Sequence, residues 1–236
     1  MKNLARTTLI AWAAAAPLYL LLYWLADRPA VRLARDRFAG TGVYTLGELI
    51  SFPGDTGVAP ILLALLLLAA VAGHFLPGGK GRSWPLALFY IWTSVFVASL
   101  AGQALKILLG RCRPELLFAG GRYGLTFFAA RWELTSTPSS HAILAFSSLT
   151  AISLLLPRGR IVFSALALLV GLSRVVLTAH YPSDVLFGAM IGIFSALWFH
   201  RLFYPPIPNP ERSRAVGSPG VTPARRSGSG PPSRRG

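Results

Sequence analysis

The chain has 236 residues, of which 53% are hydrophobic and only 13% are charged. This composition is too apolar for an ordinary soluble domain and is typical of a membrane protein. The net charge of +15 does not indicate a nucleic-acid binder, because the basic residues cluster between apolar runs and near the C-terminus. A single cysteine, Cys112, excludes an intrachain disulfide and any multi-thiolate metal site.

Six apolar stretches are candidates to cross a bilayer, which takes roughly 20 helical residues. They are Thr7–Ala26, Gly57–Leu76, Trp84–Leu105, Ala142–Leu156, Ile161–Leu177 and Val185–Phe203. The fourth is short, although starting it at Ser139 brings it to a workable length. Each is expected to be helical, because hydrocarbon cannot satisfy unpaired backbone groups. The sequence therefore predicts an all-α, polytopic membrane bundle of six transmembrane helices.

The first stretch has the basic start and the apolar run of a signal peptide. It is nevertheless about as long as a spanning helix. It ends in the bulky residues Tyr23, Trp24 and Leu25, whereas a cleavage site has small residues. We therefore expect a spanning helix here.

Basic residues near the span ends indicate the orientation. Those expected on one side are Lys2, Arg6, Lys80, Arg82, Arg158, Arg160 and Arg201. This side is predicted to be cytoplasmic. The opposite side also carries arginines, namely Arg28, Arg32, Arg35 and Arg37. An even number of spans then places both termini in the cytoplasm, with the chain in a cell (inner) membrane.

Two segments fall outside the predicted spans. The segment Val31–Phe52 mixes apolar and charged residues, which fits a helix lying in the membrane interface or a solvated loop. Beyond Tyr204 the chain is rich in Pro, Gly, Ser and Arg, so that residues 205–236 are predicted to form a disordered basic cytoplasmic tail. The predicted membrane domain is 1–204, with its catalytic core at about 84–204.

Polar side chains gather at the ends of the last four predicted spans. The third span is followed by Lys106, Arg111 and Arg113. The fourth span begins near Ser139, Ser140 and His141. The end of the fifth span lies near Ser173, Arg174, His180 and Asp184. Antiparallel connections place all three groups on one face of the membrane. Ionisable groups are costly there, which indicates a functional site.

Several of these residues suit a phosphate group. Lys106 offers a point charge, and Arg113 and Arg174 can each grip two oxygens with a planar guanidinium. Ser139 and Ser140 add hydroxyls and backbone N–H groups at a helix start, where the dipole favours an anion. Together they predict a cradle for a tetrahedral dianion.

Arginines at span ends also serve as membrane anchors. That is the expected role of Arg111, Arg122 and Arg131. Anchoring does not explain the whole set of cations, because anchors need no histidines.

His180 and Asp184 are four residues apart, within reach of one another in a helix or a tight turn. A carboxylate can orient an imidazole and support its positive charge, so His180 is the candidate nucleophile. His141, from another helix, is expected to protonate the leaving oxygen and later to activate water.

A zinc site is the alternative use of His141, His180 and Asp184, but the surrounding cations disfavour a metal ion. We therefore expect neither a metal nor another cofactor. Cys112 does not begin a cysteine-phosphatase loop, because no arginine follows it at the required spacing.

The same residues form three phrases, which are Lys106-x6-Arg113-Pro114, Pro138-Ser139-Ser140-His141 and Ser173-Arg174-x5-His180-x3-Asp184. These closely resemble the signature of the type 2 phosphatidic acid phosphatase superfamily, whose membrane members act on lipid phosphates. The resemblance covers the last four spans. One departure is Ser140, which stands where the family commonly has glycine, and we expect activity to survive it.

The resemblance implies a helical core and a metal-independent mechanism through a phosphohistidine. In that scheme His180 attacks phosphorus, Asp184 supports it, and His141 handles the leaving-group proton. Those implied to bind the phosphate are Lys106, Arg113, Ser139, Arg174 and the backbone at Ser140.

The leading hypothesis is a phosphatase for a phospholipid, an isoprenoid phosphate or a lipid A phosphate, on the extracytoplasmic face. A second is phosphotransfer from one lipid to another. A third is a non-enzymatic binder or transporter of anionic lipid. The joint presence of His141, His180 and Asp184 favours turnover over binding alone.

Overall fold

The computed structural model describes residues 2–76 and 83–205. The described residues form helices joined by loops, with one isolated β-bridge between Arg111 and Leu125. The α-helices are α1 Lys2–Leu21, α2 Asp27–Phe38, α3 Gly42–Ser51, α4 Ala59–Phe75, α5 Ser83–Leu109, α6 Pro114–Gly120, α7 Ser140–Leu155, α8 Arg160–Val176 and α9 Pro182–Phe203. The shorter turns are a π-turn at Leu22–Ala26 and 3₁₀ turns at Phe52–Gly54, Trp132–Leu134 and Pro157–Gly159. The prediction of an all-α fold is confirmed.

Four helical segments in the described part are long and apolar enough to cross a membrane. They are Lys2–Phe38, Ser83–Leu109, Pro157–Val176 and Pro182–Phe203. A fifth crossing is counted if Gly42–Gly54 and Ala59–Phe75, bent by 42°, act as one span. The apolar helix α7 has 16 residues, a length of about 24 Å against roughly 30 Å of hydrocarbon. The chain is a multi-pass membrane protein, but the predicted count of six spans is not confirmed.

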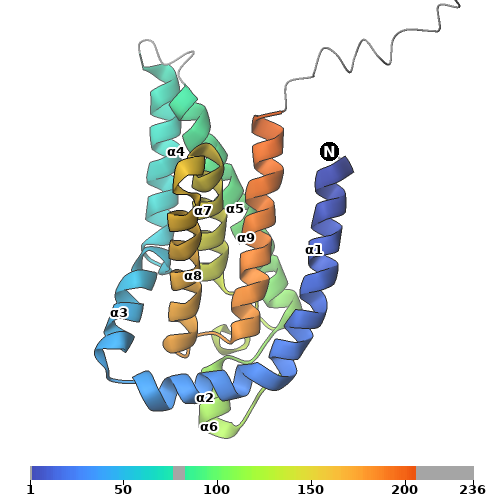
Figure 1. Cartoon of the computed structure of the whole chain (residues 1–236). Helices are drawn as coiled ribbons and strands as arrows, with labels where there is room; N and C mark the ends of the chain where they lie inside the picture. Colours follow the sequence, from blue (N-terminus) through green and yellow to red (C-terminus); the bar gives the residue numbers. More distant parts are fainter. Residues whose placement is uncertain (1, 77–82, 206–236) are drawn as a thin grey trace, which may run out of the picture. The chain divides into compact units, whose positions relative to one another are not determined.

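All six apolar stretches are helical, with bounds that differ from the prediction by a few residues. The segment predicted as an interfacial helix or a loop, Val31–Phe52, contains the end of α2 and all of α3. Gly40, with φ of +73°, lies in the turn between these two helices. Figure 1 shows α2 crossing the end of the helices at which α8 and α9 are joined.

Helix α7 lies at the centre of the membrane domain and packs against α5, α8 and α9 (Figure 1). Two glycines of α9 face α7: a Cβ at Gly188 would lie 2.6 Å from the carbonyl oxygen of Ser139, and one at Gly192 would lie 2.7 Å from that of Ile143. Small residues of this kind allow membrane helices to approach closely. This packing fixes the start of α7 against the start of α9, where the candidate residues lie.

Some predictions fall outside the described residues. The predicted tail lies outside them, except for its first residue, Pro205. Lys80 and Arg82, which contributed to the predicted orientation, are also outside.

Candidate active site

His180 lies in the tight turn between α8 and α9. Its backbone N–H and that of Ala179 both donate to the carbonyl oxygen of Arg174, at 3.2 and 3.0 Å, which closes the C-terminal end of α8. Thr178, with φ of +51°, reverses the chain just before it. Pro182 then begins α9. The backbone hydrogen bonds of this turn therefore fix the position of His180. The residue is 2% exposed.

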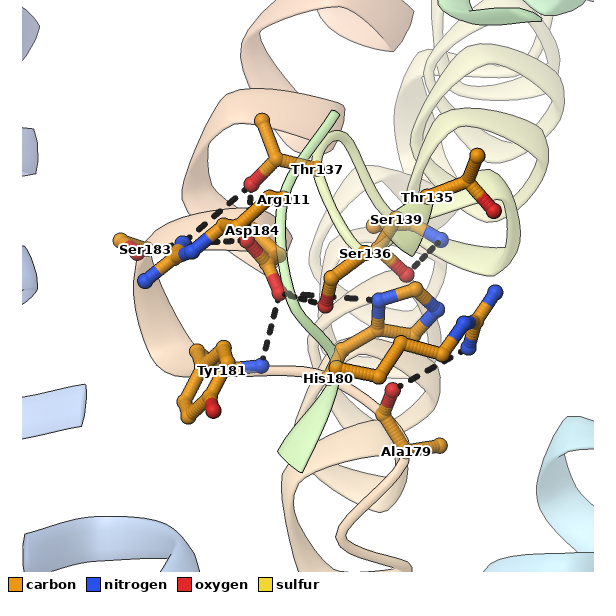
Figure 2. A network of polar contacts seen from close by, with 12 residues as sticks. Arg111, Thr135, Ser136, Thr137, Ser139, Ala179, His180, Tyr181, Ser183 and Asp184 are labelled. Carbon is orange, nitrogen blue, oxygen red and sulfur yellow. Dashed lines mark hydrogen bonds and ion pairs between the residues drawn. The ribbon is translucent and has the colours of Figure 1, made fainter. Parts of the chain in front are cut away.

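Asp184 lies in the first turn of α9, fully buried, and its carboxylate faces His180 (Figure 2). Oδ2 lies 3.7 Å from Nδ1 of His180, a distance longer than a hydrogen bond. The same oxygen accepts hydrogen bonds from the Ser136 hydroxyl at 2.6 Å and the Tyr181 backbone N–H at 2.9 Å. The carboxylate is thus held by several donors, and Nε2 is the imidazole nitrogen that faces away from it.

Arg111 is the third member of this buried group, and its predicted role as a membrane anchor is wrong. Its side chain is 0% exposed and forms ion pairs with Asp184 and, at 2.6 Å, with Asp27 of α2. It also donates to the Ser183 hydroxyl at 2.7 Å. Burial by itself lowers the pKa of Arg111, but the carboxylates of Asp184 and Asp27 outweigh burial and raise that pKa above its ordinary value.

A cleft of about 400 Å³ opens beside His180. Its polar wall contains Arg113, Ser140, His141, Arg174 and His180. These residues come from the α5–α6 connection, the start of α7, the end of α8 and the α8–α9 turn. The cleft thus brings together two imidazoles and two guanidinium groups from three separate parts of the sequence.

Neighbouring groups hold both guanidinium groups. Arg113 donates from Nε to the carbonyl oxygen of Trp132 at 2.9 Å, and its guanidinium carbon lies 4.0 Å from the centre of that indole ring. Arg174 donates from Nη1 to the hydroxyl of Ser51 at 2.8 Å. Burial lowers the pKa of Arg113 to about 10, so this side chain remains charged at pH 7.

Two predicted phosphate ligands lie outside the wall of the cleft. Lys106, near the end of α5, is buried and donates from Nζ to the carbonyl oxygen of Thr135 at 2.7 Å. The hydroxyl of Ser139 caps α7 by accepting from the N–H of Ala142 at 3.4 Å, and its own N–H donates to the carbonyl oxygen of Asp184. In this structure both residues therefore bond to the backbone around the site.

His141 pairs with a residue that the sequence did not single out. Its Nε2 lies 3.1 Å from Oδ1 of Asp55, in the loop between α3 and α4. The ring is largely buried, with 11% of the side chain exposed, and Asp55 has 51% exposed. A signal was available, because the chain has only eight acidic residues. Asp27 and Asp55 both stand beside apolar stretches, where carboxylates are costly.

The charge state of His180 follows from its surroundings. Burial lowers the pKa of His180 to about 3, with Lys106 and Arg113 acting in the same direction and Asp184 in the opposite one. The imidazole is therefore neutral at pH 7 and keeps a lone pair on Nε2. A neutral, oriented imidazole beside two guanidinium groups can attack a bound phosphate.

The arrangement differs from the alternative zinc site. His141 contacts Asp55, whereas His180 faces Asp184. Within residues 2–76 and 83–205, no three His, Cys, Asp or Glu side chains form a group that could hold a metal ion. Cys112 is buried beside Arg111 and outside the wall of the cleft.

Comparisons with known proteins identify the family to which the chain belongs. Residues 87–207 match the model of the PAP2 superfamily. A lipid A 1-phosphatase from Rhizobium etli is 35% identical over 169 residues, covering 67% of this chain and 72% of that protein. Another, from Rhizobium johnstonii, is 32% identical over 166 residues, covering 66% and 68%.

The fold also matches a solved structure, a transmembrane PAP2-type phosphatidylglycerolphosphate phosphatase from Bacillus subtilis. The TM-score is 0.52 at 18% identity, with 80% of this chain and 94% of the other covered. At that identity the match bears on the fold alone. The resemblance seen in the three sequence phrases is confirmed, and the chain belongs to the PAP2 superfamily.

Proposed function

We propose that this protein is a membrane lipid phosphatase that releases phosphate through a phosphohistidine formed on His180, without a metal ion. The main support for the proposal is the shared cleft, in which His141 at the start of α7 and His180 in the α8–α9 turn face the same space as Arg113 and Arg174. Two cations suit a phosphate dianion, and they repel a metal ion. The two imidazoles supply a nucleophile and a proton donor.

In the first step, Arg113, Arg174 and the backbone at Ser140 hold the phosphate. Nε2 of His180 attacks phosphorus, so that a P–N bond forms while the ester P–O bond breaks. Asp184 stabilises the resulting cationic imidazole. His141 gives a proton to the leaving oxygen, and the lipid leaves as an alcohol.

In the second step, the enzyme is restored by water. His141, now neutral, takes a proton from water as its oxygen attacks phosphorus. The P–N bond breaks, its electrons return to His180, and inorganic phosphate is released. Each proton taken from His141 in the first step is thus returned in the second, so His141 acts as acid and then as base.

Lys106 and Ser139 complete the proposed phosphate-binding set by different means. Lys106 is buried near Arg113 and adds positive charge to the site from behind the cleft wall. Ser139 caps α7 and so orients the first-turn N–H groups, which favour an anion.

We propose a lipid A phosphate as the first substrate to test. The relatives with the broad matches are lipid A 1-phosphatases, at 35% and 32% identity. Phosphatidic acid, phosphatidylglycerol phosphate and undecaprenyl diphosphate carry the same reacting group and belong in the same panel. We place the site on the extracytoplasmic face of an inner membrane, with both termini in the cytoplasm.

The test is phosphate release from this panel by the full chain, purified in detergent, with and without EDTA. Release that survives EDTA and disappears in His180→Ala supports the proposal. Release that EDTA abolishes contradicts the metal-free mechanism. Binding without release indicates a lipid binder, and transfer of labelled phosphate to an added lipid acceptor indicates a phosphotransferase.

A further inference from the structure

The loop between α3 and α4 lies directly against His141. Besides the contact of 3.1 Å between Asp55 and Nε2, Gly54 faces the ring closely: a Cβ at position 54 would lie 2.4 Å from Cδ2 of His141. Gly54, Asp55 and Thr56 all line the cleft that holds the two histidines. This loop belongs to the N-terminal third of the chain, before the region 87–207 that matches the family model.

The backbone fixes the position of Asp55. Its N–H donates to the carbonyl oxygen of Phe52 at 3.1 Å, within the 3₁₀ turn Phe52–Gly54. Its carbonyl oxygen accepts from the N–H groups of Val58 and Ala59, both at 2.9 Å, where α4 begins. The carboxylate therefore projects from a hydrogen-bonded turn, although half of it is exposed to solvent.

The charges around His141 give this contact a chemical consequence. A histidine that acts as a general acid must first carry a proton and a positive charge. Arg113 and Arg174 line the same cleft, and Lys106 is buried behind it, so three cations oppose that charge. Among the described residues, Asp55 supplies the carboxylate in direct contact with the ring.

We propose that Asp55 is a positioning residue for His141, holding Nε2–H and stabilising the imidazolium, so that Nδ1 exchanges the proton with the leaving oxygen and then with water. This inference rests on the proposed phosphohistidine mechanism. The site then contains two carboxylate–histidine pairs, with Asp184 supporting the nucleophile and Asp55 supporting the acid.

The first test is a double-mutant cycle with Asp55→Asn, His141→Gln and the double variant. It measures kcat/KM for the panel lipid that the wild-type protein hydrolyses fastest. Asp55→Asn is expected to lower kcat/KM by roughly 10-fold or more, which is part of the roughly 10²- to 10⁴-fold that a full general acid contributes. In the His141→Gln background the same change is expected to cost little, because Asp55 acts only through His141. Additive losses would overturn the proposal.

A second readout separates positioning from a merely structural role. With p-nitrophenyl phosphate the leaving phenolate needs little protonation, and kcat/KM reports the steps up to phosphohistidine formation. Asp55→Asn should therefore lower kcat/KM much less for this ester than for the lipid alcohol ester. Equal losses for both substrates would indicate a structural effect and contradict the proposal. Asp36→Asn, an exposed carboxylate of α2, is the control and should leave both values unchanged.

The loop offers a matched pair of glycines as a third test. Gly54→Ala places a methyl group where the His141 ring lies, whereas a Cβ at Gly57 meets no atom within 4 Å. We expect Gly54→Ala to reproduce the selective loss on the lipid ester at an unchanged Tm, because the ring can turn aside. Gly57→Ala should retain wild-type kinetics. Equal kinetics in the two variants would mean that the loop does not position His141.

The variants His180→Ala and Asp55→Asn separate the mechanism from the role of Asp55. If His180→Ala retains turnover, the phosphohistidine mechanism itself is wrong. If His180→Ala is inactive while Asp55→Asn keeps wild-type values with both substrates, the mechanism stands and the role of Asp55 is refuted.

Discussion

Arg111 forms an ion pair with Asp184 at a point where neither side chain has any solvent exposure. The other terminal nitrogen of Arg111 pairs with Asp27, so one guanidinium joins helix α2 to the carboxylate that faces His180. Removing one partner from a buried ion pair leaves an uncompensated charge, which is strongly destabilising. Asp184, which supports His180, therefore depends on an ion-pair network that includes Asp27 of α2.

Asp27→Asn tests this dependence. It is expected to lower stability by about 3 kcal/mol or more, which corresponds to a Tm lower by roughly 6 °C or more in a chain of this size. Asp36→Asn, on the exposed side of α2, is the matched control and should change stability by less than about 0.5 kcal/mol. Thermal unfolding in one detergent provides the measurement. Equal Tm values for the two variants would show that the buried pair does not stabilise the fold.

Arg174→Lys tests how the cleft grips phosphate. Lysine keeps the charge but loses the planar fork and the geometry of the hydrogen bond to Ser51. We expect kcat/KM to fall by about 10-fold or more, because a bidentate contact is lost. Arg122→Lys, at an exposed arginine, should have no effect. Wild-type kinetics in Arg174→Lys would remove this residue from the phosphate site.

The depressed pKa of His180 predicts a pH dependence of stability. In the folded protein that pKa is about 3, against about 6.5 for an ordinary histidine, so between these values the unfolded chain binds more protons. The neutral, buried His180 therefore costs no stability above about pH 6.5. As the pH falls, protonation of the unfolded chain lowers the free energy of unfolding by about 2 kcal/mol between pH 7 and pH 5. Tm measurements at both pH values should therefore show a larger drop for the wild type than for His180→Gln. The same drop in both proteins would contradict a buried, neutral His180.

The proposed orientation can be tested with single cysteines in a Cys112→Ala background. Arg37→Cys lies on the end of the protein that carries the site, and Arg158→Cys lies in the turn between α7 and α8 at the other end. A membrane-impermeant maleimide should label position 37 in spheroplasts, and position 158 only after the inner membrane is opened. The reverse labelling pattern would place the site in the cytoplasm.

Hydropathy was sufficient to locate the helices of the six apolar stretches, because any backbone in hydrocarbon must satisfy its hydrogen bonds internally. It also indicated that the fourth stretch is short, and α7 has 16 residues. The spacing within the three phrases also predicted the histidines and arginines of the cleft wall. His180 and its neighbours lie in one turn, so local sequence carries their geometry.

Contacts between distant segments were missed. Asp27 meets Ser183 across 156 positions, and Asp55 meets His141 across 86. Neither carboxylate belongs to a phrase. Arg111 was assigned as an anchor because the sequence alone does not say which way an arginine at a span end points. Arg131, assigned the same role, has 79% of its side chain exposed.

The proposed function depends on covalent phosphorylation of His180 during turnover. The most direct measurement is rapid quenching of the purified protein with a ³²P-labelled panel lipid, followed by peptide mapping. We expect an acid-labile, base-stable phosphoryl group on the peptide that contains His180, and no such label in His180→Ala. Turnover without label on this peptide, or with label on another residue, would contradict the proposed function.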